Sequence, residues 1–141
     1  MDFMNQDYWK TYGDIAKAEI RKQLELGRKR FAIYPYGQVG VLVKYILNNY
    51  FEIHEEYIID NGQADSKNIF RIQDIQYEKD IYFLICSVNS GSYVQVRRNI
   101  LEKIPSENII DLFGNVYEYE RINEKKVHEV LAFLEEFSKY E

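Results

Sequence analysis

The stretch RFAIYPYGQVGVLVKYILNNYFEIHEEYIID, residues 30–60, decides the fold. It begins with a short apolar run at 31–34, which is typical of a strand buried on both faces of a parallel sheet. A glycine turn at 36–40 leads into a helix, whose inward stripe is predicted to be Val39, Leu42, Val43, Ile46, Leu47 and Tyr50. The run at 57–59 then returns as a second buried strand, so the stretch predicts a βαβ unit.

The glycine turn partly matches the dinucleotide-binding fingerprint. In that pattern three glycines allow a tight turn, close approach of the ligand and close packing of the helix, whose N-terminus binds the pyrophosphate. Gly37 and Gly40 match the second and third glycines, and Asp60 lies where an acidic residue would accept ribose hydroxyls. Pro35 replaces the first glycine, and because proline lacks an N–H and has a fixed φ, the loop cannot fold quite as the full fingerprint does.

The remaining segments complete an α/β pattern. Further strands are predicted at 69–72, 81–87 and 108–112, and amphipathic helices at 7–26, 92–103 and 123–139. The inward side of the helix at 92–103 is predicted to carry Val94, Val96, Ile100, Leu101 and Ile104. We expect one Rossmann-like domain over 1–141 with a core at 28–113, flanked by the helices at 7–26 and 123–139. It should be a three-layer α/β sandwich with a mostly parallel five-stranded sheet in the order 3-2-1-4-5. The helical pattern at the end also fits a chain cut from a longer protein.

Charge and composition restrict the partners. The net charge of −5 argues against nucleic acid and membrane surfaces, and no apolar run approaches the roughly 20 residues of a membrane span. We therefore expect no nucleic-acid partner and no membrane insertion. The single cysteine and the lack of a signal-peptide core indicate a cytoplasmic protein. We interpret the 13 tyrosines as a compositional bias rather than a base-stacking surface.

The sequence offers no catalytic or metal-ligating group. His54 and His128 lie far apart in the chain, and Cys86 ends a buried strand without a histidine to activate it. No Cys or His pair has metal-ligand spacing. The run at 28–30 is interpreted as a solvated basic cluster, and the acidic residues Glu55, Glu56, Glu78 and Asp80 as solvated strand flanks.

A ligand site is predicted at the carboxyl edge of the sheet, at the switch point between the first and fourth strands. Its candidate residues are Tyr36, Gly37, Gln38, Val39, Gly40, Asp60, Asn61, Ser87, Asn89 and Ser90. The N–H groups of Gln38 and Val39 would bind a phosphate, and Asp60 would accept from a sugar hydroxyl. The structural alternative is that the glycines serve only the turn, Asp60 caps a turn with Asn61, and Ser90 caps its helix.

Four motifs carry a resemblance to a known group of domains: IYPYGQVGV at 33–41, YIIDN at 57–61, YFLICSVNS at 82–90 and SENIIDLF at 106–113. The chain resembles the Rossmann-like domains of bacterial surface-polysaccharide biosynthesis, which are attached to glycosyltransferases, sugar methyltransferases and sugar acyltransferases. Tyr34, Gly37, Gly40, Asp60 and Asn61 match the pattern of these domains, whereas Pro35 and Tyr36 depart from it.

The resemblance implies a nucleotide- or nucleotide-sugar-binding module that is non-catalytic by itself. Its ligand would be a nucleotide-sugar or NAD, and it would serve a further catalytic domain or partner chain. Two alternatives stay open: a small NAD-dependent oxidoreductase-type enzyme, which the lack of a Tyr-x-x-x-Lys pair near the crevice disfavours, and a ligand-free protein-interaction domain.

Overall fold

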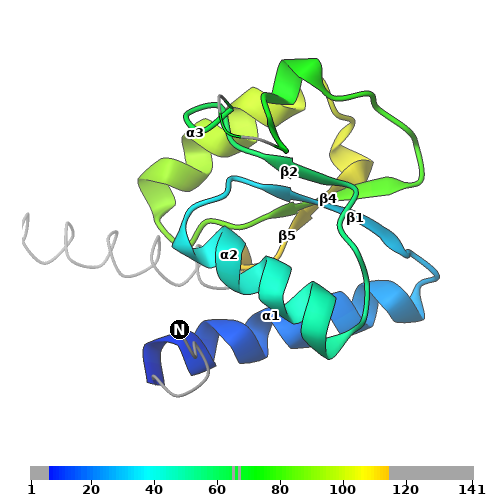
Figure 1. The fold of residues 1–141 in the computed structure, drawn as a ribbon, viewed down its shortest axis with the longest axis vertical. Coiled ribbons are helices and arrows are strands. Elements are labelled where there is room, and N and C mark those ends of the chain that lie inside the picture. The colour runs from blue at the N-terminus through cyan, green and yellow to red at the C-terminus, as the bar shows by residue number, and fades with distance from the viewer. Residues whose placement is uncertain (1–6, 65, 67, 115–141) are drawn as a thin grey trace, which may run out of the picture.

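The computed structural model describes residues 7–64, 66 and 68–114, and within them the strands form one parallel five-stranded sheet (Figure 1). The strands are β1 (Arg30–Tyr34), β2 (Tyr57–Ile59), β3 (Ile69–Phe70), β4 (Ile81–Ile85) and β5 (Ile109–Asp111). Their order is β3-β2-β1-β4-β5, and every neighbouring pair is parallel. The predicted fold class and strand order are confirmed.

Helices cover both faces of this sheet. They are α1 (Asp7–Glu25), α2 (Gln38–Tyr45) with its π-helical continuation η2 (Ile46–Tyr50), and α3 (Ser90–Leu101). The connections from β1 to β2 and from β4 to β5 run in opposite directions along the sheet, so right-handed crossovers place α2 and α3 on opposite faces. In Figure 1 α1 packs beside α2, and α3 lies across the sheet from them. The helix predicted at 123–139 lies outside the described residues.

The two central strands form the middle of the core. Phe31, Ala32 and Ile33 of β1 are completely buried, as are the apolar side chains Phe83 and Leu84 of β4. The two strands pair over their whole length, from Arg30 opposite Ile81 to Tyr34 opposite Ile85. This burial on both faces explains why their sequences are apolar without alternation.

Two predicted helix faces are wrong in part. Tyr50 was expected to face inward, but its side chain is 50% exposed. The reason is the π-helical turn at Ile46–Tyr50, in which the Phe51 N–H donates to the Ile46 carbonyl at 3.2 Å. This turn shifts the residues at its end off the α-helical period. In α3, Val94 and Leu101 are 47% and 44% exposed. Val96 and Ile100 of that helix are buried as predicted, as is Ile104 just after it, and Tyr93 is buried as well.

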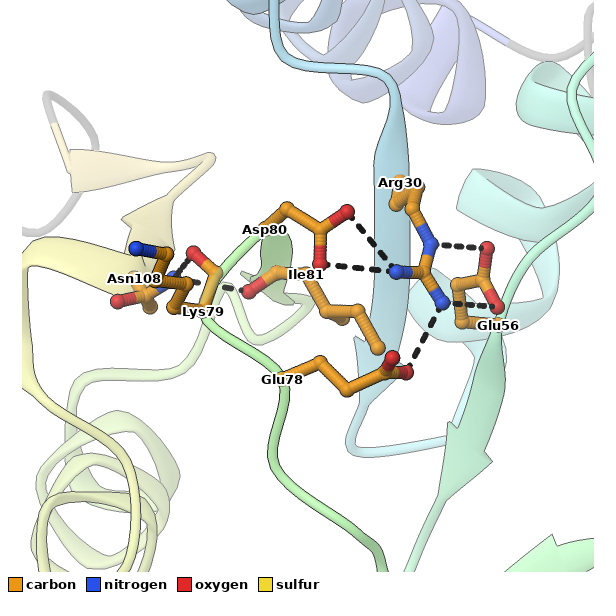
Figure 2. Close-up of polar contacts among 7 residues, drawn as sticks. All are labelled: Arg30, Glu56, Glu78, Lys79, Asp80, Ile81 and Asn108. Atoms are coloured by element: carbon orange, nitrogen blue, oxygen red, sulfur yellow. Dashed lines mark hydrogen bonds and ion pairs between the residues drawn. The ribbon is translucent and has the colours of Figure 1, made fainter.

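At the amino edge of the sheet Arg30 joins three segments (Figure 2). Its guanidinium forms ion pairs of 2.9 Å with Glu56, 2.9 Å with Glu78 and 2.8 Å with Asp80. The hydrogen bond from Arg30 lowers the pKa of Asp80. These side chains are exposed or partly exposed, as the interpretation of solvated charges expected, but they are also paired with one another, which the sequence did not indicate. They tie the start of β1 to the segments that precede β2 and β4.

The buried side chain of Asn108 makes a second link at this edge. Its Nδ2 donates to the carbonyls of Lys79 and Ile81, at 2.9 and 3.1 Å (Figure 2). Its Oδ1 accepts from the Tyr77 hydroxyl at 3.1 Å. Asn108 thus attaches the segment before β5 to the start of β4.

Among the helices of the described residues, none has the length and apolar character that a membrane crossing requires.

Candidate functional site

The carboxyl edge of the sheet is organised by Asp60, at the end of β2. Its Oδ2 accepts hydrogen bonds from the Tyr36 N–H at 3.0 Å and from Gln63 Nε2 at 3.2 Å, and its Oδ1 accepts from the Gly62 N–H at 2.9 Å. Gln63 also donates to the Tyr36 carbonyl at 2.6 Å. The carboxylate therefore caps its own turn, which was the structural alternative, and in addition holds the loop between β1 and α2.

The two glycines of that loop have different environments. A methyl group at Gly40 would collide with the Pro35 carbonyl oxygen, so glycine is required there for the close approach of α2 to the loop. A methyl group at Gly37 would meet open space, and the φ of Gly37 is −88°, which any residue adopts. Gly40 thus has a packing role, whereas Gly37 faces room in which another molecule could approach the backbone.

Two helices begin at this edge, and only one carries a side-chain cap. The Asn89 side chain accepts from the N–H groups of Gly91 and Ser92, at 3.0 and 3.2 Å, and so closes the N-terminus of α3. The cap position of α2 is Gly37, which has no side chain to do this. The first N–H groups of α2, including those of Gln38 and Val39, are therefore the donors with capacity to bind an anion.

The other predicted residues have internal roles. Asn61 Oδ1 accepts from the Ile72 N–H at 3.0 Å, at the start of η3 (Ile72–Asp74). Ser87 is buried, and its hydroxyl donates to the Asn89 carbonyl at 3.3 Å. Ser90 is the first residue of α3. The structure therefore joins Tyr36 to Asp60 and Ser87 to Asn89, while Asn61 is directed toward η3.

Two titratable side chains next to this edge, those of Tyr34 and Cys86, are buried. Burial raises the pKa of Tyr34, against a hydrogen bond from Asn99 that lowers it, and the charge of Asp60 adds to the increase. Burial also raises the pKa of Cys86, whose Sγ donates to the Leu84 carbonyl at 3.4 Å. Both side chains are therefore neutral at neutral pH, and Cys86 behaves as a small hydrophobic residue. Within the described residues no group of three or more His, Cys, Asp or Glu could hold a metal ion.

Three cavities lie away from the predicted edge. One of about 510 Å³ is bounded by Lys44, Glu55 and Tyr57, and one of about 470 Å³ by Lys44, Asn48 and His54. Glu55 is not the solvated residue predicted, since only 5% of its side chain is exposed. It accepts from Asn48 at 3.1 Å and pairs with Lys44 at 3.3 Å. The third cavity, of about 170 Å³, lies where α1 meets α2 and η2.

Beside this third cavity is a basic and aromatic surface that sequence reasoning missed. Lys17 and Arg21 of α1 lie over the ring of Tyr50, with Lys17 Nζ at 4.5 Å and Arg21 Cζ at 5.8 Å from the ring centroid. Arg21 Nη2 also donates to the Tyr50 hydroxyl at 2.7 Å. The signal in the sequence was the pair of tyrosines at 45 and 50, but it could be used only once the π-helical turn was known.

Fold and loops together define a Rossmann-like α/β domain with one capped and one uncapped helix N-terminus at the carboxyl edge of its sheet. No protein-family model matches the chain, and no solved structure matches it. The chain is similar to a DNA primase from Borreliella burgdorferi (strain ATCC 35210 / DSM 4680 / CIP 102532 / B31), with 24% identity over 110 residues. The match covers 74% of this chain and 19% of the primase, so the chain spans about a fifth of the length of the curated relative it matches.

This similarity corrects two expectations. The function expected from the resemblance, a nucleotide-sugar-binding module of surface-polysaccharide biosynthesis, is overturned because the relative is a DNA primase. The exclusion of nucleic acid as a partner is overturned by the same finding. The argument from net charge failed because a net charge averages over all faces of the molecule. Residues 7–29 carry six Lys or Arg and four Asp or Glu, a net charge of +2, in a chain of net −5. The resemblance to polysaccharide-biosynthesis domains stays a prediction about the fold alone.

Proposed function

We propose that this α/β domain is a nucleic-acid-binding module of a protein related to DNA primases. The observation that carries the proposal is the 110-residue similarity to a DNA primase, which extends over three quarters of the chain. The proposal is confined to binding, because the chain spans only 19% of that relative. We also propose a cytoplasmic location for the module, because a single cysteine fits a reducing compartment.

The distribution of unpaired positive charge supports the proposal. Among the described residues, Arg30, Lys44 and Arg97 form ion pairs with carboxylates, and Lys103 donates to two backbone carbonyls. By contrast, within the same described part of the chain no ion pair joins a carboxylate to the basic side chains of α1 and the turn after it: Lys10, Lys17, Arg21, Lys22, Arg28 and Lys29. Arg71, Lys79 and Arg98 also have no carboxylate partner among the described residues, but they lie on three separate segments. Phosphate groups bind where positive charge is clustered and not already neutralised, so the α1 side, with six such residues, is the favourable one.

The first turn of α2 supplies a second kind of phosphate donor. Its N–H groups lack a side-chain cap, and open space lies beside Gly37. A backbone phosphate of the nucleic acid could be bound there by the amides of Gln38 and Val39, as helix N-termini bind anions elsewhere. This keeps the predicted edge as part of the proposal, with Asp60 holding the loop rather than contacting the ligand.

Direct titration tests the proposal. The full chain is added to fluorescently labelled single-stranded and duplex oligonucleotides of about 20 nucleotides, and anisotropy is followed at low and at moderate salt. Saturable binding that weakens with salt is expected. Poly-glutamate, an anionic polymer without bases, serves as competitor and should displace the oligonucleotide poorly. If neither oligonucleotide is bound at low salt, the proposed function is wrong.

A further inference from the structure

We infer that Lys17, Arg21, Tyr45, Asn49 and Tyr50 form a binding site for single-stranded nucleic acid, here called the α1–η2 surface. The inference rests on the proposed function. It adds where on the molecule the nucleic acid binds and that the nucleic acid is single-stranded. The five residues come from α1, the end of α2 and η2, and four of them line the cavity of about 170 Å³.

Tyr50 is the centre of this surface. Its side chain is half exposed, and its ring is held by Lys17 and Arg21 through cation–π contacts and by the hydrogen bond from Arg21 to its hydroxyl. The ring of Phe51 contacts it edge-on, with centroids 4.8 Å apart and planes at 81°. An aromatic ring that is both fixed and exposed is a platform on which a base can stack.

Tyr45 lies on the same side because of the π-helical turn. In an α-helix, residues five apart are separated by roughly 140° around the axis. The i→i+5 bonding of η2 spreads one turn over more residues and brings the two positions close to alignment. Accordingly Tyr45 and Tyr50 line one cavity, and Tyr45 is 45% exposed. π-Helical turns of this kind occur frequently at functional sites.

Charge and hydrogen-bonding groups complete the surface. Neither Lys17 nor Arg21 forms an ion pair with a carboxylate in the described part of the chain, so both charges are available to phosphates beside a base stacked on Tyr50. Asn49 is exposed, and its Nδ2 donates to the Tyr45 carbonyl at 3.1 Å. Its Oδ1 accepts no hydrogen bond from the described residues and can accept one from the edge of a base.

These features fit a single strand better than a duplex. Stacking on Tyr50 requires a base whose face is accessible, which a paired and stacked base does not offer. The cavity of about 170 Å³ lies below the roughly 300–1,000 Å³ of pockets that enclose a ligand, so it suits partial entry of one base. Residues 7–29 carry a net charge of +2 in a chain of net −5, so the positive charge beside this surface is limited in extent, which favours a short contact with one strand.

The experiment compares variants of the full chain in anisotropy titrations with labelled single-stranded DNA, single-stranded RNA and duplex DNA. Tyr50→Ala removes the stacking platform, and Tyr50→Phe keeps the ring without its hydroxyl. Lys17→Gln with Arg21→Gln removes the two charges. Phe70→Ala is the matched aromatic control, since Phe70 is exposed on the far edge of the sheet, and Arg71→Ala with Arg98→Ala is the matched charge control. Ultraviolet crosslinking of the wild-type complex, followed by peptide mapping, locates the contact independently of folding.

We expect Tyr50→Ala to weaken single-strand binding roughly 5- to 150-fold, the range for one lost stacked base, and Tyr50→Phe to weaken it far less. Crosslinks should map to the peptides that contain Tyr45 and Tyr50. One outcome would overturn the inference alone: Tyr50→Ala and the double charge variant bind as well as the wild-type chain, and the crosslinks map elsewhere. The assignment of binding to the α1–η2 surface would then be wrong, whereas the proposed function would stand. Tighter binding of duplex than of both single strands overturns the inference. If the wild-type chain binds no nucleic acid, the proposed function fails, and the inference fails with it.

Discussion

The Asp60 carboxylate accepts a hydrogen bond from the Tyr36 N–H at 3.0 Å, so the turn after β2 holds the loop after β1. The two residues are 24 positions apart and come from the carboxyl ends of adjacent strands. The shape of the loop before α2 therefore depends on a residue that the fingerprint of dinucleotide-binding folds would assign to the ligand.

Asp60→Ala should destabilise the fold. The substitution leaves the partly buried Tyr36 N–H without its acceptor and removes the cap of the turn at Gly62, which should lower the free energy of unfolding by roughly 1–3 kcal/mol. Urea titration followed by circular dichroism measures the change. Asp74→Ala, at an exposed carboxylate in η3, should change the same quantity by less than about 0.5 kcal/mol. Equal effects of the two substitutions would contradict the role given to Asp60.

Gly40→Ala and Gly37→Ala should separate the two glycines of the loop. The methyl group at residue 40 would collide with the backbone oxygen of Pro35, and the resulting shift should cost roughly 1–3 kcal/mol, more than the gain of up to about 1 kcal/mol from the better helix propensity of alanine. The methyl group at residue 37 meets open space, so its effect should stay within about 0.5 kcal/mol. Thermal and urea unfolding of both variants test this, and a Gly40→Ala protein as stable as Gly37→Ala would disprove the close approach.

The uncapped first turn of α2 should respond to nucleic acid, whereas that of α3 should not. In a ¹⁵N-labelled chain, a single-stranded oligonucleotide should shift the amide signals of Gly37, Gln38 and Val39, because their N–H groups have no side-chain acceptor. The amides of Gly91 and Ser92 are bound to Asn89 and provide the control within the same spectrum. Larger shifts at Gly91 and Ser92 than at Gly37 would exclude the phosphate contact proposed at α2.

Stability should fall in acid partly through Glu55. Burial alone would raise its pKa, but the hydrogen bond from Asn48 and the charge of Lys44 outweigh it and leave the pKa lowered. A carboxyl group whose pKa is lower in the folded state stabilises fully above its unfolded pKa, about 4.3, and loses that contribution as the pH falls through the folded value. Glu55→Gln should therefore flatten the loss of stability below about pH 4.3, measured as urea midpoints from about pH 7 to 3. Glu107→Gln, at an exposed carboxylate, should run parallel to the wild type; if Glu55→Gln does so as well, Glu55 is not the group responsible.

The sheet could be predicted because its signals are local. The runs at 31–34 and 81–85 are apolar at every position except the tyrosines, and only a central strand of a parallel sheet buries both of its faces. The order of the strands followed from the Rossmann-like pattern of the elements. The structural alternative placed the cap of α3 at Ser90, but the adjacent Asn89 supplies it, because Ser90 is already the first residue of the helix.

The residues that were misjudged depend on partners far away in the chain. Arg30 is paired with carboxylates 26 to 50 residues later, and no local pattern marks those partners. Tyr50 fits the α-helical period of the inward stripe, and only the change to π-helical bonding after Tyr45 turns it outward. Its contacts with Lys17 and Arg21 require in addition that α1 packs beside α2. The exposed aromatic surface therefore could not be derived from composition.

The most direct test of the account is the salt dependence of single-strand binding by the full wild-type chain. The logarithm of the association constant for an oligonucleotide of about 20 nucleotides is plotted against the logarithm of the sodium chloride concentration. Neutralisation of two phosphates by Lys17 and Arg21 predicts a slope of about −1.4 or steeper. A slope near zero, or no binding at the lowest salt, would contradict the claim that this acidic chain binds nucleic acid through its basic side.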